Sequence, residues 1–265
     1  MDEYTKQLIA DARATYRPVL TGKDSRITRG TVLWDQFERA AEACRTDAKG
    51  GERALAERIN EMAVAKVLAE DKGLKGLITY EPDLLPDGRK IDFVAERAKD
   101  NAYVEVKTVH PDIADTDAAW KRYEERRKLH PEQADFIVHK DWMGGKLYGN
   151  TFASRSRFLE YTLDFETRLA AAQKVKPGPG LLVFCGNGVR WHRSNLEDFA
   201  DYYHAGKHRQ DDPFAKMEQY HIEQQKLQLL RNVDNFGCLV RPIEMVEKTN
   251  FVWPVRGPSF GGVVK

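Results

Sequence analysis

Residues 90–109 hold two short runs that are rich in β-branched and aromatic residues, and this segment constrains the fold more than any other. The runs KIDFVA at 90–95 and AYVEVKTV at 102–109 have the composition of strands. The charged stretch between them is only long enough for a tight connection. We therefore expect an antiparallel hairpin and, with it, a sheet in the centre of the fold.

Helical patterns and further strands flank this hairpin. A helix is expected at 52–71, after a break at Gly50-Gly51, and a short apolar run at 77–80 predicts a first strand. A helix at 154–173 and a buried strand at 181–185 follow. The order of helix, three strands, helix and strand predicts an α/β fold with a mixed central sheet flanked by helices.

The remaining segments suggest a domain organisation. Residues 1–50 are interpreted as an N-terminal helical segment of two helices, separated by Pro18 and a polar stretch. The core domain is expected at 51–245, and 246–265 is interpreted as a C-terminal tail. Residues 110–150 are long for a connection within a compact domain, so we interpret them as an insertion.

The composition excludes several classes of protein. With 265 residues, 42% of them hydrophobic, the chain can bury a sizeable core. No apolar run approaches the roughly 18 residues of a membrane span, so no membrane partner is expected. Cys44, Cys185 and Cys238 are far apart and form no CxxC pair, which argues against a zinc knuckle or a disulfide framework. The charged amino terminus lacks a secretory signal, and we expect a cytoplasmic protein.

The second strand of the hairpin carries two charges on one face. Side chains of a strand alternate between its faces, so Val104 and Val106 point one way while Glu105 and Lys107 point the other. Adjacent charges on a strand with apolar surroundings require a partner or a role.

A carboxylate on the first strand is expected to lie opposite this charged face. If the hairpin turns about Ala98 and Lys99, Asp92 falls opposite Glu105. Like charges in that arrangement repel each other unless a positive group lies between them. Carboxylate oxygens together with water and a substrate phosphate suit Mg²⁺, with Mn²⁺ as a substitute. The hairpin therefore predicts a divalent cation site.

Asp92, a gap of twelve residues and then Glu105-Val106-Lys107 resemble the signature of the PD-(D/E)xK nuclease superfamily, which has a restriction-endonuclease-like fold. Its members include restriction endonucleases, Holliday-junction resolvases and DNA-repair nucleases. The resemblance covers about 52–186 and departs from the pattern at Ile91, where the motif has proline. It implies that Asp92 and Glu105 bind the metal, that Lys107 positions or activates the attacking water, and that the reaction is phosphodiester hydrolysis.

Other residues fit the letters of the motif. Asp87 and Asp83 each follow a proline and are alternatives to Asp92 as the first acid. Asp87 lies in a Pro-Asp-Gly turn, where aspartate ordinarily bonds its own backbone, so Asp92 is preferred. The tripeptides at 47–49 and 70–72 also match (D/E)xK, but they lie at helix ends or in loops and are interpreted as solvated charges.

The resemblance also implies an acidic residue on the helix before the strands. Glu57 and Glu61 lie one turn apart on the same face of that helix. Glu61 continues an inward-facing stripe with Val64 and Leu68, so it is the preferred metal ligand. The alternative is that both are surface acids.

A nearly neutral chain needs local basic residues to bind a polyanion. The net charge is +1, which argues against a generally basic coat. The insertion holds the densest basic group, and its alternative interpretation is a solvated helix paired internally with Glu124 and Glu125. The predicted nucleic-acid-binding residues are Lys121, Arg122, Arg126, Arg127 and Lys128.

Three functional hypotheses follow from these patterns. The first is a Mg²⁺-dependent nuclease that cleaves nucleic acid, with DNA favoured over RNA. Relatives that cut both strands are commonly dimers, which suggests that this protein forms a homodimer. The second is a catalytically inactive nucleic-acid-binding module on the same fold. The third is an unrelated α/β protein in which Glu105 and Lys107 form a salt-bridge ladder on an open sheet face.

Overall fold

The computed structural model describes residues 1, 3–46, 48–97, 99–109, 153–186, 196, 199–200, 203–204, 232–239 and 251–252. The helices in these ranges are α1 (Glu3–Thr21), α2 (Gly30–Thr46), α3 (Ala48–Glu70) and α6 (Ala153–Val175). The strands are β1 (Ile27–Thr28), β2 (Ile78–Tyr80), β3 (Phe93–Glu96), β4 (Asn101–Val109), β5 (Gly180–Gly186), β6 (Val233–Leu239) and β7 (Phe251–Val252).

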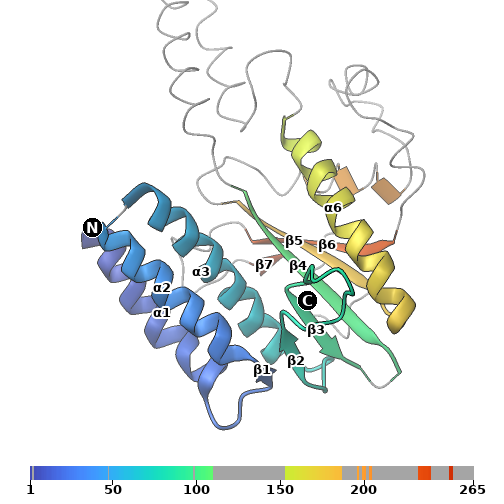
Figure 1. Ribbon diagram of the computed structural model, residues 1–265, viewed down its shortest axis with the longest axis horizontal. Helices are drawn as coiled ribbons and strands as arrows, with labels where there is room; N and C mark the ends of the chain where they lie inside the picture. The colour runs from blue at the N-terminus through green and yellow to red at the C-terminus, as the bar shows by residue number, and fades with distance from the viewer. Residues whose placement is uncertain are drawn as a thin grey trace, which may run out of the picture.

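The strands form one mixed sheet in the order β1-β2-β3-β4-β5-β6-β7 (Figure 1). β1 runs parallel to β2, and β4, β5 and β6 are parallel to one another. The remaining neighbours are antiparallel. The predicted α/β class, with a mixed sheet flanked by helices, is confirmed.

The hairpin has the predicted register. β3 and β4 are antiparallel, with Phe93 opposite Val104 and Glu96 opposite Asn101. The backbone N–H of Arg97 donates to the carbonyl of Asp100 and closes the turn. Extending the register by one residue places Asp92 across from Glu105.

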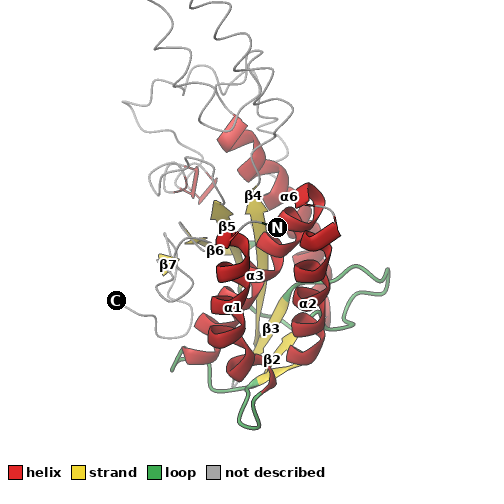
Figure 2. Ribbon diagram, turned by 90° about the vertical axis from the view of Figure 1, so that its left-hand side faces the viewer, coloured by secondary structure: helices red, strands yellow, loops and turns green. Residues whose placement is uncertain are grey.

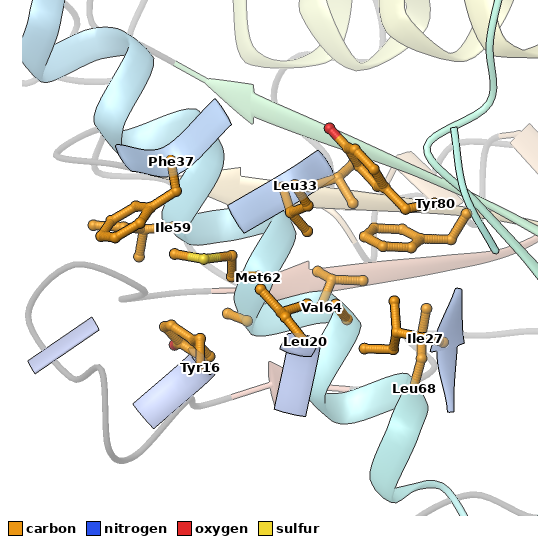
Figure 3. Packing of buried hydrophobic residues seen from close by; sticks show 14 of the residues in the cluster. Tyr16, Leu20, Ile27, Leu33, Phe37, Ile59, Met62, Val64, Leu68 and Tyr80 are labelled. Atoms are coloured by element: carbon orange, nitrogen blue, oxygen red, sulfur yellow. The ribbon is translucent and has the colours of Figure 1, made fainter. Parts of the chain in front are cut away.

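Two hydrophobic cores cover the two faces of the sheet. The first core joins α1, α2 and α3 to one face, and α3 lies directly against the strands (Figures 1 and 2). Figure 3 shows part of this core, to which Ile59, Met62 and Val64 of α3 and Leu33 and Phe37 of α2 belong. The second core joins α6 to the opposite face.

The side chains of β4 alternate between these cores, as expected for a strand. Val104 and Val106 belong to the core under α3, whereas Tyr103 belongs to the core under α6. Glu105 and Lys107 therefore lie on the face covered by α6, which gives the charged pair of the motif a helix as its neighbour.

Two sequence predictions about helix boundaries were wrong. α3 begins at Ala48 and continues through Gly50-Gly51, where a break was expected. A Cβ atom at Gly51 would lie 2.5 Å from the backbone nitrogen of Cys44, so this glycine allows α2 and α3 to approach closely. Likewise, α1 continues through Pro18 to Thr21, whereas the predicted polar stretch does separate α1 from α2.

Described segments of both predicted flanking regions join the central sheet or its core. α1 and α2, within the predicted N-terminal segment 1–50, share one core with β2, β3 and β4. β7, within the predicted tail 246–265, pairs with β6. The predicted insertion 110–150 lies outside the described residues, and none of the helices in the described ranges is apolar enough over sufficient length to cross a bilayer.

Candidate active site

Asp92 lies immediately before β3 and reaches across to β4. Its Oδ2 accepts a hydrogen bond from the backbone N–H of Val106 at 2.7 Å. Its own carbonyl accepts from the N–H of Glu81 at 2.8 Å, which fixes the backbone at the start of the strand. The carboxylate of Asp92, the preferred first acid of the motif, is thus held at Val106, between Glu105 and Lys107 in the sequence of β4.

The electrostatic surroundings of Asp92 disfavour its negative charge. Burial is the largest cause, and the nearby carboxylates of Glu105 and Glu61 add to it, so the pKa of Asp92 lies well above its usual range. The N–H of Val106 and the ammonium of Lys107 oppose this rise without cancelling it. The three predicted metal-binding acids therefore act on one another, and an added positive charge would stabilise Asp92 in its ionised form.

Glu105 is buried under α6 and is compensated there by an arginine. Its side chain is 2% exposed. Arg168 of α6 donates from Nη1 to Oε2 at 2.9 Å and from Nη2 to Oε1 at 2.7 Å. This two-point pairing is the strongest geometry for an arginine and a carboxylate.

Lys107 and Asp164 complete a ring of four alternating charges, which we call the α6 charge ring. Nζ of Lys107 lies 2.8 Å from Oε1 of Glu105 and 3.3 Å from Oδ2 of Asp164. Nη2 of Arg168 lies 2.7 Å from that same Oδ2. Each charge in the ring has two neighbours of opposite sign, so the ring as a whole is neutral.

Glu61 lies on the α3 side of the same region. Its Oε2 accepts from Nη1 of Arg58 and from the hydroxyl of Tyr80, both at 2.8 Å. Gln36 of α2 accepts from Arg58 at 2.6 Å, so the N-terminal helices contribute to this cluster. In Figure 3 the hydroxyl of Tyr80 points out of the apolar cluster in which its ring is packed.

The pKa of Glu61 is raised to about 7. Burial is the largest cause, and Glu81 and Glu105 contribute in the same direction. Arg58 and the hydrogen bond from Tyr80 lower the pKa but do not offset the burial. Glu61 can therefore exchange a proton near neutral pH.

The structure separates the preferred acids from their alternatives. The side chain of Glu57 is 35% exposed and that of Glu61 only 9%, in agreement with the predicted inward stripe. Asp87 is exposed and accepts from the backbone N–H of Arg89 at 3.0 Å, which is the turn role expected of it. Asp83 is exposed as well.

Two charged residues that the sequence analysis did not single out are central to this arrangement. Arg168 follows the inward positions Phe165 and Tyr161 at spacings of 3 and 7, so it had to face the sheet. Arg58 precedes Glu61 and Met62 by 3 and 4. A charge at a core-facing helical position is a signal for a buried partner of opposite sign.

The predicted nucleic-acid-binding residues lie outside the described part of the chain. These are Lys121, Arg122, Arg126, Arg127 and Lys128.

The acidic side chains are compatible with a Mg²⁺ ion that takes only one or two of its ligands from the protein. Among the described residues, no group of three or more His, Cys, Asp or Glu side chains converges closely enough to hold a metal by itself. Mg²⁺ commonly takes one or two carboxylates and fills its other positions with water and substrate oxygens. Asp92 and Glu105 would supply the two carboxylates for that mode of binding, and Glu61 is a third acid whose charge reaches Asp92.

Comparison of the chain with models of known families, with curated proteins and with solved structures finds no significant match. Inference about function therefore depends on the residues and their geometry.

Proposed function

We propose that this protein is a metal-dependent nuclease with a restriction-endonuclease-like core, which hydrolyses phosphodiester bonds of nucleic acid, DNA rather than RNA. In this proposal Asp92 and Glu105 hold Mg²⁺, Glu61 supports its water shell, and Lys107 acts on the attacking water. The order α3, β2, β3, β4, α6 and β5 supports the proposed core. The protein acts in the cytoplasm, and a homodimer would allow cleavage of both strands of a duplex.

One observation carries the proposal. Asp92, Glu105 and Glu61 come from a loop end, a strand and a helix. The charges of Glu105 and Glu61 nevertheless both raise the pKa of Asp92. Folding brings these like charges together at an energetic cost, which is typical of catalytic sites. A divalent cation would offset that cost, and Lys107 lies beside it.

The chain's own groups divide the work of hydrolysis. Burial lowers the pKa of Lys107, but the charge and hydrogen bond of Glu105 and the charge of Asp92 together raise it above its usual value, so Lys107 remains protonated at neutral pH. Lys107 can therefore hold the attacking water or stabilise charge on the phosphorus centre, but it cannot act as the base. In the metal-free protein the pKa of Glu61 is about 7, which makes its carboxylate the candidate to accept the proton of that water. Bound Mg²⁺ would polarise the phosphoryl oxygen and acidify a water molecule.

A second candidate is a catalytically inactive nucleic-acid-binding module on the same fold. It is favoured by the pairing of both Glu105 oxygens with Arg168, which occupies the carboxylate that a metal would need. The third hypothesis, a ladder on an open sheet face, disagrees with the burial of Glu105 under α6.

A cleavage assay distinguishes the two candidates. Linear, circular, single-stranded and branched DNA, and RNA, would be incubated with Mg²⁺ or with EDTA. The nuclease proposal expects cleavage that requires Mg²⁺, that is lost in Asp92→Asn and Glu105→Gln, and that is slowed in Lys107→Ala. Asp87→Asn is the matched control, because Asp87 is the exposed alternative acid. Binding without cleavage in every condition would favour the inactive module.

A further inference from the structure

Arg168 has more hydrogen-bonding capacity than the described protein uses. A guanidinium has five N–H donors. Four of them are used, by the two oxygens of Glu105, by Oδ2 of Asp164 at 2.7 Å and by the carbonyl of Lys90 at 2.6 Å. Arg168 thus bonds both carboxylates of the α6 charge ring and also the backbone at Lys90.

The fifth donor, Nε of Arg168, is buried and has no hydrogen-bond partner among the described residues. The side chain of Arg168 is only 8% exposed. A buried donor without an acceptor is costly, so native proteins rarely keep one without a use. An acceptor that arrives from outside would satisfy it.

The route to Arg168 lies along the charged side of the ring. Asp164 has a side chain that is 51% exposed, and that of Lys107 is 22% exposed. Lys107 and Arg168 both contact the half-exposed Asp164, so an anion that approaches Lys107 also comes near Arg168.

The charges in this region fit a phosphodiester as that acceptor. The α6 charge ring is neutral by itself, and Asp92 and Glu61 lie within electrostatic reach of it. A divalent cation held by Asp92 and Glu105 would add two positive charges, and the negative charge of a phosphodiester would offset part of them.

We infer that Arg168 is a phosphate-binding residue that couples substrate binding to metal binding. In the metal-free protein its guanidinium compensates Glu105. When Glu105 is engaged by a divalent cation, part of the guanidinium is released to bind a phosphodiester oxygen of the nucleic acid. This inference rests on the proposed nuclease function.

The inference requires opposite effects of one substitution on two ligands. Without the guanidinium, a cation no longer competes for Glu105, so Arg168→Gln should bind Mn²⁺ alone more tightly, by about tenfold or more. The same variant lacks a phosphate contact, so an oligonucleotide should bind more weakly in Ca²⁺, by about tenfold.

The experiment measures Mn²⁺ binding by isothermal titration and binding of a fluorescein-labelled DNA duplex by anisotropy in Ca²⁺. Arg13→Gln is the matched control, because Arg13 of α1 also makes a two-point pairing with a glutamate, from Nε and Nη2 to Glu38 of α2. Both affinities of this control should equal those of the wild type. Arg168→Lys keeps the positive charge but loses the planar group that makes two parallel hydrogen bonds. It should therefore bind Mn²⁺ as the wild type does and DNA more weakly. If Arg168→Gln does not fold, the comparison of Arg168→Lys with the wild type tests the inference in its place.

Two outcomes overturn the inference. Weaker binding of both ligands would mean that Arg168 only maintains the fold, and unchanged DNA binding would mean that it only compensates Glu105. Failure of the proposed function gives a different result. In that case the wild type binds Mn²⁺ no more tightly than Asp92→Asn does.

Discussion

Replacing Glu61 by glutamine should stabilise the metal-free protein, and the gain should depend on pH. Glutamine resembles the protonated acid in shape and still accepts the hydrogen bond from Tyr80. It also cannot ionise, so it removes the charge that burial disfavours at this position.

The size and sign of the effect follow from the pKa of Glu61. In the folded protein this pKa is about 7, against an ordinary value of 4.5. Below pH 4.5 the carboxyl is protonated in both states and costs nothing. As the pH rises to 7, the unfolded chain loses its proton first, so the free energy of unfolding of the wild type falls. At about 1.4 kcal/mol per pH unit the fall reaches about 3 kcal/mol.

Urea unfolding in EDTA across this pH range provides the measurement. The difference between Glu61→Gln and wild type should be near zero at the acidic end and should grow to about 3 kcal/mol at pH 8. Glu57→Gln is the control, because Glu57 lies one turn away on α3 and is 35% exposed. At pH 8 its effect on the free energy of unfolding should be smaller than that of Glu61→Gln.

A constant difference across the series, or a wild type that is more stable than Glu61→Gln at pH 8, would refute this reasoning. Either result would mean that Arg58, at 2.8 Å, compensates Glu61 fully despite its burial. In Mg²⁺ the proposed function expects a smaller difference, because a cation stabilises the ionised carboxylate in the wild type alone.

Three further predictions concern other parts of the chain. Neutralising Arg126, Arg127 and Lys128 together should weaken DNA binding in Ca²⁺ for all sequences alike, and the salt slope should fall by about 0.9 per lost duplex phosphate contact. An unchanged slope would assign this segment another task. Gly51→Ala should lower the free energy of unfolding by about 1–3 kcal/mol in a urea titration, because its Cβ meets the backbone of α2. Tyr103→Phe should cost about 1 kcal/mol in the same assay, since the carbonyls of Ala172 and Lys176 near the end of α6 lose the hydroxyl hydrogen that they share. Equal stability of either variant would contradict these contacts.

The hairpin and its acids were predictable because local rules determine them. A short charged loop between two strand-like runs fixes the register, and the register places Asp92 across from Glu105. The burial of Glu61 followed from its spacing to Val64 and Leu68 on one helical face. In each case the relevant partners lie within the same hairpin or the same helix.

The compensating charges depend on contacts that local patterns do not specify. Arg168 meets Glu105 across 63 residues of sequence, and Gln36 meets Tyr80 across 44. The role of Gly51 was misread for the same reason, because a glycine that permits close packing of two helices looks in sequence like a helix break. Only the position of Arg168 on the inward face of α6 hinted that a buried acid would meet it.

The sheet order has a consequence for how the protein is made. Every described strand pairs only with its neighbours in the chain, and domains generally fold from the N-terminus as the ribosome releases them. The sheet can therefore grow one strand at a time, because no strand has to enter between two that are already paired. Glu105 emerges with β4, but Arg168 follows 63 residues later. During that interval the charges of β4 lie along the open edge of a nascent sheet, where charged residues discourage pairing with other chains.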